Sequence, residues 1–305
     1  MSAALTLYRY PFAAMGSPCE LQLYAPNAAQ GKRVSGQLIA DVARLEQRYS
    51  RYRPDSVLSA INRVAATGGS IEVDAETARL LDYAHTCYLQ SEGLFDVSSG
   101  ILRRAWRFDR AQLPKQAAID ALLVHIGWHK LHWQAPLLSF PHAGMELDFG
   151  GIVKEYAVDR LAALARCLGI THGLVNLGGD ICIIGAHPDG SAWQVGVRHP
   201  RDPNALITCV ALQAGALASS GDYERCLLID GQRYGHILNP HTGYPTKHLA
   251  AVSVVSDFCV VAGSAATIAM LKAEQGANWL NALGLAHYWV TVTGQTGGSL
   301  LTDSL

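Results

Sequence analysis

The stretch Tyr234-Gly-His-Ile-Leu-Asn-Pro-His-Thr-Gly-Tyr-Pro245 sets one histidine between an apolar run and two turn-forming segments. Residues 227–230 and 232–238 are predicted to form two strands joined across Asp230-Gly231, a dipeptide that favours a two-residue hairpin turn. The prolines and glycine that follow predict that the chain turns twice soon after His236. A histidine held at a strand end between turns is positioned for a contact, although a surface hairpin with an incidental histidine is an equal alternative from these residues alone.

Outward from this stretch, apolar residues recur at helical spacing in some segments and at strand spacing in others. The predicted helices cover about 34–49, 78–88, 153–168 and 260–271. The predicted strands cover about 5–13 and 19–24 on either side of a turn at Ala14-Met15-Gly16-Ser17, then 146–149, 173–185 with a bulge at Gly178-Gly179, 193–197, 206–212, 251–256 and 288–292. The polar, proline-bearing segment 109–144 is the candidate linker. This order predicts one α+β unit of mixed sheets and helices over 1–305, with a division into lobes of about 1–145 and 146–305 left open.

Composition limits the classes of partner. Of the 305 residues, 24 are Lys or Arg and 25 are Asp or Glu, so no overall field attracts nucleic acid or an anionic membrane. The longest apolar run, 249–271, contains Asp257 and small polar residues, which argues against a membrane span. Tyr8-Arg9-Tyr10-Pro11 stands where a signal peptide needs its apolar segment. We expect a cytoplasmic protein, although a chain trimmed of its leader has the same appearance.

Three other kinds of site are weakly indicated. The seven cysteines are widely spaced without a C-x-x-C pair, so we expect buried thiols rather than disulfides. His125 and His129 have the spacing of a helical zinc pair, but Ile126-Gly127-Trp128 interrupts a helix and favours packing histidines. Ser219 or Ser220 is a candidate hydrolase nucleophile, yet neither lies in a G-x-S-x-G turn.

A second informative stretch is Asp148-Phe-Gly-Gly-Ile-Val-Lys154, which predicts a short strand, a Gly-Gly turn and a helix start. Glycines at a helix start let backbone amides approach a phosphate, and the helix dipole favours the anion there. Lys154 adds a positive charge in the first turn. Such junctions are common, so an ordinary junction with Asp148 as a cap is the alternative.

Taken together, several short motifs occur in the order seen in the ApbE family, the FAD:protein FMN transferases, and the chain resembles that family from about Tyr10 to Leu271. The resemblance implies a T-fold-related α+β fold, bound FAD and Mg²⁺. It also implies transfer of FMN from FAD to a threonine or serine hydroxyl of an acceptor flavoprotein, with release of AMP. The motifs are Met15-Gly16-Ser17, Tyr52-Arg53-Pro54-Asp55-Ser56, Phe95-Asp96, Asp148-Phe-Gly-Gly-Ile-Val-Lys154, Asn176-Leu-Gly-Gly-Asp180, Ser220-Gly-Asp-Tyr-Glu224 and Gly235-His-Ile-Leu-Asn-Pro-His-Thr-Gly-Tyr-Pro245.

By the same resemblance, individual residues receive expected roles. His236 is expected to be catalytic, as general base or in assisting the leaving group. The Gly151 carbonyl and the Thr267 hydroxyl are expected to bind the metal. The residues expected to hold FAD are Met15, Tyr52, Leu94, Phe95, Asp96, Asp148, Lys154 and the backbone near Leu238.

The chain also departs from the family pattern. Gly263 stands where the family has a metal-binding aspartate, Asn239 replaces an aspartate after His236, and Glu155 stands where glycine is usual. Magnesium is usually held by one or two carboxylates with phosphates, so we expect weakened magnesium binding. An FAD pyrophosphatase or an FAD-binding protein on the same scaffold is therefore the alternative function. The sequence specifies neither the acceptor protein nor the oligomeric state.

Overall fold

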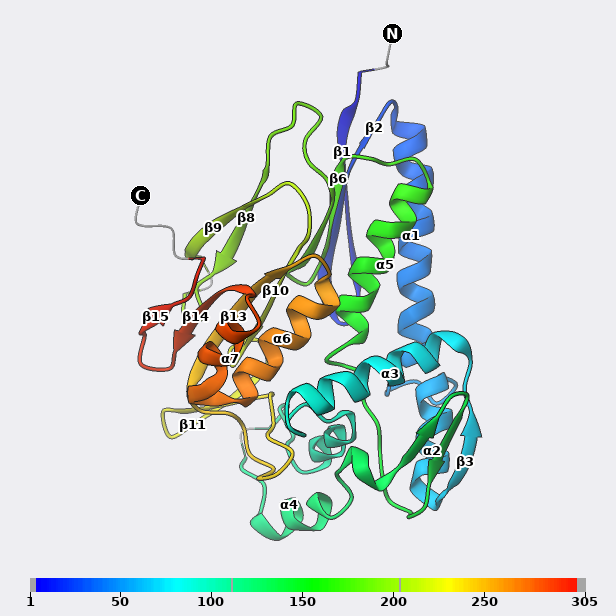
Figure 1. Ribbon diagram of the computed structural model, residues 1–305, viewed down its shortest axis with the longest axis vertical. Helices are drawn as coiled ribbons and strands as arrows, with labels where there is room; N and C mark the ends of the chain where they lie inside the picture. Colours follow the sequence, from blue (N-terminus) through cyan, green and yellow to red (C-terminus); the bar gives the residue numbers. More distant parts are fainter. Residues whose placement is uncertain (1–3, 111, 203, 301–305) are drawn as a thin grey trace.

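The computed structural model describes residues 4–110, 112–202 and 204–300, and an antiparallel eight-stranded sheet forms the centre of these residues (Figure 1). Its order, β1-β2-β6-β7-β10-β13-β14-β15, follows the sequence, with the N-terminal hairpin beside β6 from the middle of the chain and the C-terminal strands at the opposite edge. The strands are β1 (Thr6–Ala14), β2 (Ser17–Ala25), β6 (Gly173–Leu177), β7 (Asp180–Gly185), β10 (Ala216–Gly221), β13 (Leu249–Ser256), β14 (Ala286–Thr291) and β15 (Thr296–Gly297).

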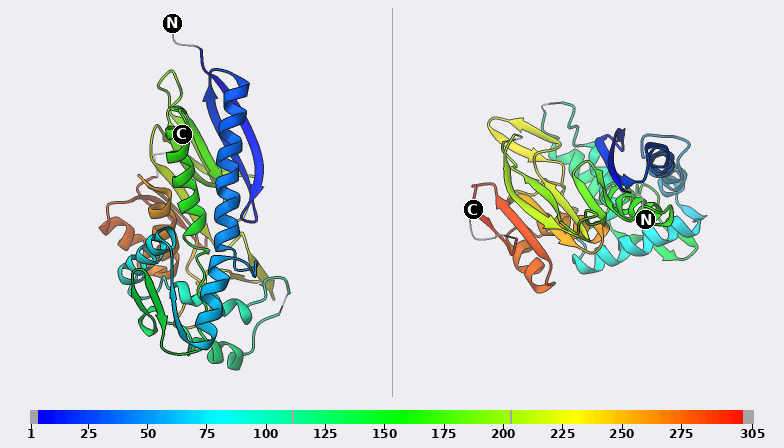
Figure 2. Two further views of the ribbon diagram at one scale, coloured as in Figure 1. Left: turned by 90° about the vertical axis from the view of Figure 1, so that its right-hand side faces the viewer. Right: turned by 90° about the horizontal axis from the view of Figure 1, so that it is seen from above.

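The two faces of this sheet have different covers because successive strand residues point to opposite sides. On β6, Val175 packs in the main core beneath the helices, whereas its neighbour Leu174 packs with Trp193 of β8. Helices α1 and α5 run side by side along the sheet (Figure 2). The covering elements are α1 (Ala28–Tyr49), α5 (Val153–Cys167), α6 (Cys259–Leu271) and α7 (Gly276–Ala282) on one face, and the hairpin β8 (Trp193–Arg198) and β9 (Leu206–Leu212) on the other.

The segment between α1 and α5 forms the lower part of the molecule in Figure 1. The prediction that residues 109–144 form a linker is wrong. This segment folds into α4, β4 and β5, and Ile119 and Leu138 are fully buried. The elements here are α2 (Val57–Thr67), β3 (Gly69–Glu72), α3 (Ala75–Gln90), η1 (Val97–Arg104), α4 (Gln116–Leu123), η2 (Trp128–Lys130), β4 (His132–Gln134) and β5 (Leu137–Phe140). The remaining elements are the hairpin β11 (Cys226–Ile229) and β12 (Gln232–Gly235), and η3 (Ala273–Gln275).

The four predicted helices and the hairpin across Asp230-Gly231 are confirmed, and three local predictions are corrected. Gly178-Gly179 is a two-residue turn between β6 and β7 instead of a bulge, with φ of 65° and 97°. Residues 146–149 form no strand; the Asp148 N–H donates to the carbonyl of Val97 in η1 instead. β12 ends at Gly235, so His236 follows the strand.

The long apolar run 249–271 is divided between β13 and the 13-residue α6. Within the described ranges, no helix combines the length and the apolar character that crossing a bilayer requires. All seven cysteines are free thiols, and the expectation that they are buried holds for Cys19, Cys87, Cys182 and Cys259 but is wrong for the exposed Cys167 and Cys209 and the half-buried Cys226.

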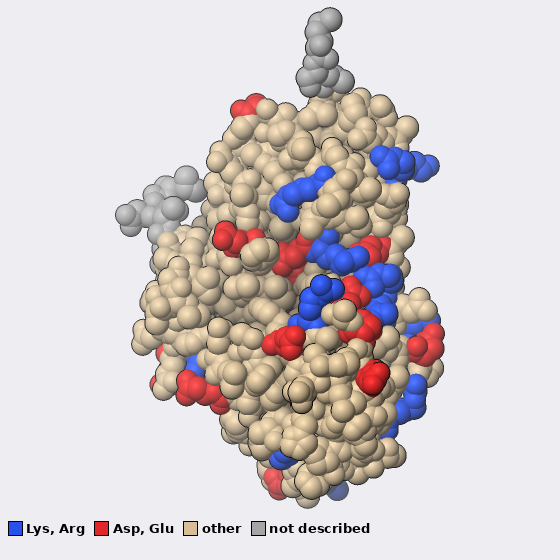
Figure 3. Space-filling view, turned by 45° about the vertical axis from the view of Figure 1, so that its right-hand side comes forward, with Lys and Arg blue, Asp and Glu red and all other residues tan. Residues whose placement is uncertain are grey.

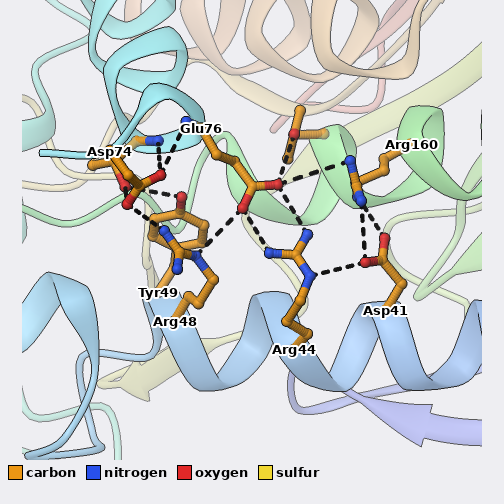
Figure 4. Close-up of polar contacts among 9 residues, drawn as sticks. Asp41, Arg44, Arg48, Tyr49, Asp74, Glu76 and Arg160 are labelled. Carbon is orange, nitrogen blue, oxygen red and sulfur yellow. Dashed lines mark hydrogen bonds and ion pairs between the residues drawn. The ribbon is translucent and has the colours of Figure 1, made fainter.

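Charged side chains gather in a band over α1, α3 and α5 (Figure 3). Arg44 of α1 donates to both carboxylate oxygens of Glu76 in the first turn of α3, at 2.6 and 2.9 Å (Figure 4). Asp41 of α1 accepts from both Arg44 and Arg160 of α5. The network therefore fixes the first turn of α3 against the two helices of the sheet.

The variant Glu76→Gln is expected to lower the free energy of unfolding by about 1–2 kcal/mol, because it removes charge-assisted hydrogen bonds to a half-exposed arginine. The Arg44 hydrogen bonds lower the pKa of Glu76, so this contribution is complete above the unfolded value and is lost as pH falls through the folded value. Urea unfolding at neutral and acidic pH measures both effects. The exposed Glu72→Gln on β3 is the control, and equal stability of the two variants at low salt would contradict the expectation.

Candidate active site

Two tight turns lie side by side where β2 meets β6. Gly16 belongs to the β1–β2 turn and Gly178 to the β6–β7 turn, and the Gly178 N–H donates to the carbonyl of Pro18. An ideal Cβ on Gly178 would lie 2.8 Å from the Ser17 Cβ, so only glycine permits this approach, and Gly178 has a positive φ as well. The two hairpins thus bring backbone that is far apart in sequence to one place.

Three cationic side chains border these turns. A guanidinium nitrogen of Arg225 lies 3.3 Å from the ideal Cβ position of Gly16, and one of Arg198 lies 3.3 Å from that of Gly179. Lys154 Nζ lies 3.9 Å from the ideal Cβ position of Gly178. Cations beside glycine turns are suited to a ligand that carries several negative charges.

Lys154 is held in place by a buried carboxylate. It lies in the first turn of α5, and its Nζ forms an ion pair with Asp180 Oδ2 at 2.5 Å. Burial of the ammonium disfavours its charge, but Asp180 and Glu155 outweigh this and raise the pKa of Lys154. Lys154 therefore stays charged across the physiological range.

His236 is half-buried and lies near three cationic side chains. Its Nδ1 has no hydrogen-bond partner within the described part of the chain. Burial, followed by the charges of Arg103, Arg225 and Lys154, lowers the pKa of His236 to about 4. The imidazole is therefore neutral at physiological pH, and a neutral imidazole can accept a proton.

An NMR titration of the protein without ligand is expected to give His236 an apparent pKa near 4, against about 6.5 for an unperturbed histidine. Because the folded value is the lower one, the unfolded chain binds the proton more readily. Neutral His236 thus contributes stability that is complete above about pH 6.5 and is lost as pH falls toward 4. A measured value above 6 would show that the imidazole is solvated rather than buried.

Several of the predicted FAD-binding residues adjoin this cluster. Asp148 forms an ion pair with Arg51 at 2.8 Å and lies 3.8 Å from Arg103, which links it to His236. The Phe95 ring lies 3.2 Å from the ideal Cβ position of Gly151, so the glycine leaves room for the ring. The structure thus brings Lys154, His236, Asp148 and Gly151 into one connected region.

Other predicted residues serve the fold or stand apart. The buried Asp96 carboxylate accepts from the N–H and hydroxyl of Ser98 and from the N–H of Trp128, so both of its oxygens are engaged. Met15 and Leu94 pack at the edge of the main core, and Leu238 packs in a second cluster and bridges to Pro245. Tyr52 is 77% exposed, directly after Arg51.

The hydroxyl groups near α6 are paired with one another. Ser220 Oγ and Thr267 Oγ1 are 2.7 Å apart, and Ser219 Oγ and Ser253 Oγ are also 2.7 Å apart. Among the described residues neither Ser219 nor Ser220 has a histidine partner, so the hydrolase alternative lacks its general base.

The histidines considered for zinc have different neighbours. His125 packs against Gly144, whereas His129 Nδ1 is 3.2 Å from the Tyr88 hydroxyl. Within the same described ranges, no group of three or more His, Cys, Asp or Glu side chains has the geometry to hold a metal.

Sequence reasoning missed the arginines of this region, Arg103, Arg198 and Arg225. They come from three separate segments, and no spacing in the sequence connects them. Only Arg225 had a signal, because it directly follows the motif Ser220-Gly-Asp-Tyr-Glu224.

A family model described as the ApbE family matches residues 15–289 of the chain. A curated protein named FAD:protein FMN transferase from Klebsiella pneumoniae is 32% identical over 82% of this chain and 78% of its own length. Another protein of that name, from Rhodobacter capsulatus, is 29% identical over 87% of this chain and 51% of its own length. The chain therefore spans about half the length of the Rhodobacter relative.

Solved structures agree with these sequence matches. The ApbE protein of Thermotoga maritima superposes with a TM-score of 0.89 at 27% identity, over 97% of both chains. The apo form of the Pseudomonas stutzeri flavinyl transferase ApbE gives a TM-score of 0.85 at 25% identity, over 98% of this chain and 97% of its own. These matches confirm the predicted α+β fold.

Proposed function

The chain belongs to the ApbE family, and on that premise we propose that it transfers FMN from FAD to a threonine or serine hydroxyl of an acceptor flavoprotein, releasing AMP. Its enzyme class is transferase, the class of its named relatives. The observation that carries the proposal is the neutral, half-buried His236 near Arg103, Arg225 and Lys154, cations that also border two glycine turns. That arrangement combines a proton acceptor with charges that favour a pyrophosphate.

The transfer step fits these groups. The acceptor oxygen forms a bond to the FMN phosphorus, the bond from that phosphorus to the oxygen bridging to AMP breaks, and AMP leaves. The hydroxyl proton is assigned to His236, whose unpartnered Nδ1 marks a free hydrogen-bonding position on the ring. Lys154, Arg225 and Arg103 stabilise the negative charge that builds on the phosphate oxygens.

The residues assigned to FAD follow from the resemblance and are supported by their placement. Lys154 and the glycine turns are assigned to the pyrophosphate, and Phe95 and Asp148, which adjoin this region, to the remainder of FAD, with Met15, Leu94, Asp96, Leu238 and Tyr52 as further assignments. Glu155 Oε2, which has no hydrogen-bond partner among the described residues, and Asp180 Oδ2, which is ion-paired with Lys154, are buried oxygens that suit a hard cation, so the donor set fits Mg²⁺, with Gly151 and Thr267 as further oxygen donors. Bound Mg²⁺ would neutralise phosphate charge.

The test combines purified protein, FAD and a threonine-bearing acceptor peptide, with Mg²⁺ or with EDTA. AMP is quantified by HPLC and flavinylated peptide by mass spectrometry. Transfer predicts equal amounts of AMP and modified peptide. AMP without modified peptide would identify an FAD pyrophosphatase, and FAD binding without AMP would identify a binding protein; both outcomes contradict the proposal.

A further inference from the structure

Glu155 is a buried carboxylate without a hydrogen-bond partner for one of its oxygens. It lies in the first turn of α5, only 8% exposed, and Oε2 has no partner among the described residues. Burying an unpaired carboxylate costs several kcal/mol unless a proton or a cation compensates it. Burial and the nearby Asp180 raise the pKa of Glu155, and Lys154 opposes them. Without a cation the raised pKa keeps a proton on this carboxyl, and a bound divalent cation would take the place of that proton.

The side chain of Glu155 occupies the space beside Gly263 of α6. An ideal Cβ on Gly263 would lie 2.5 Å from Glu155 Cγ and 3.2 Å from Glu155 Oε1. Any larger residue at 263 would therefore collide with Glu155. Gly263 therefore leaves the space that the Glu155 side chain fills, and the Glu155 carboxylate lies beside the position where a side chain at residue 263 would begin.

The surroundings supply further oxygen atoms. Thr267 lies one turn after Gly263 and so on the same face of α6, and its hydroxyl is 2.7 Å from that of Ser220. Asp180 contributes a second buried oxygen, Oδ2, which pairs with the Lys154 ammonium but accepts no hydrogen bond of good geometry. When a divalent cation displaces the proton from Glu155, two carboxylates face one ammonium, and the donors are hard oxygens that magnesium and manganese prefer.

We propose that Glu155 supplies the carboxylate of a divalent-cation site, from α5 instead of α6, with Asp180 and Thr267 as neighbouring donors. The role of this cation in FMN transfer rests on the proposed function, but the binding of the cation does not, because binding can be measured without transfer. The sequence led us to expect weakened magnesium binding because Gly263 replaces an aspartate; we now expect that Glu155 takes the place of that aspartate as a metal ligand.

The test measures Mn²⁺ binding by electron paramagnetic resonance, with and without FAD, in wild type and Glu155→Gln. The variant is expected to bind Mn²⁺ at least tenfold more weakly. Its unfolding temperature in EDTA is expected to equal or exceed that of wild type, because a buried ionisable group is replaced by a neutral amide of similar size. The exposed Glu274→Gln is the control and is expected to match wild type in both measurements.

A swap separates the ligand role from general damage. Glu155→Gly combined with Gly263→Asp is expected to recover Mn²⁺ affinity to within about threefold of wild type. Gly263→Asp alone is expected to fail, because its Cβ would meet Glu155. Equal Mn²⁺ binding by wild type and Glu155→Gln, or no Mn²⁺ binding by wild type, would overturn the proposal whether or not FMN is transferred. Normal Mn²⁺ binding without transfer would overturn the proposed function alone.

Discussion

Replacing His236 by alanine is expected to lower the rate of FMN transfer by about 10²- to 10⁴-fold, the usual contribution of a positioned proton acceptor. The affinity for FAD is expected to change little, because the pyrophosphate is assigned to Lys154, the arginines and the glycine turns. The effect should therefore fall on kcat rather than on KM. Single-turnover flavinylation of an acceptor peptide, together with FAD titration, measures the two quantities separately.

Two controls make this result specific. His241→Ala removes an exposed histidine from the turn that follows and is expected to keep full activity. Added imidazole is expected to restore part of the rate of His236→Ala, because a diffusible base can enter the space left by the side chain. Full activity of His236→Ala would remove the assigned role, and a slow variant that imidazole does not rescue would point to packing instead.

Lys154→Met is expected to lower both stability and FAD affinity. It keeps the apolar stem but leaves Asp180, only 3% exposed in its side chain, without its cation. Leaving a buried charge unpaired lowers the free energy of unfolding by about 3–5 kcal/mol. We expect a value near the lower limit, because the Lys154 side chain is 23% exposed and water can partly solvate Asp180 once the ammonium is gone. Urea unfolding measures the stability, and fluorescence titration measures the loss of FAD binding.

A double-mutant cycle identifies the cause of the destabilisation. Adding Asp180→Asn to Lys154→Met is expected to recover most of the lost stability but none of the FAD affinity. Lys272→Met is the matched control, since its partner Glu92 is 82% exposed and can be solvated when the lysine is lost. Destabilisation by Lys272→Met as large as that by Lys154→Met would show that removal of any lysine has this effect.

Much of the fold was predictable because it follows from local patterns. Val34, Leu38 and Val42 recur at helical spacing, and all three are buried in α1. Asp230-Gly231 forms the expected turn, with positive φ at both residues. The segment 109–144 was wrongly predicted to be a linker because most of its residues are polar. The few apolar residues that pack it into the fold, such as the buried Ile119, form no clear pattern in the sequence.

The site was only partly predictable because it depends on packing between distant segments. Lys154 and His236 stood in recognisable motifs, and the structure connects them. Arg198, at the end of β8, reaches the Gly178-Gly179 turn only because the β8–β9 hairpin packs on the face of the sheet that contains this turn's strands. Likewise, Glu155 and Gly263 differ from the family pattern at two positions far apart in the sequence. Their contact becomes visible only in the structure, where α5 packs against α6.

The pairing of β2 with β6 also affects how the protein is synthesised. Leu23 lies opposite Gly173, so the ribosome must translate for on the order of ten seconds after the first hairpin before the partner strand exists. During that interval the hairpin has an open edge, and the apolar face of α1 lacks its neighbour α5. The nascent chain therefore needs protection from association with other chains. Because Arg225 and His236 emerge later still, the proposed FAD site is incomplete until they have been translated, and FAD is not expected to assist the early stages of folding.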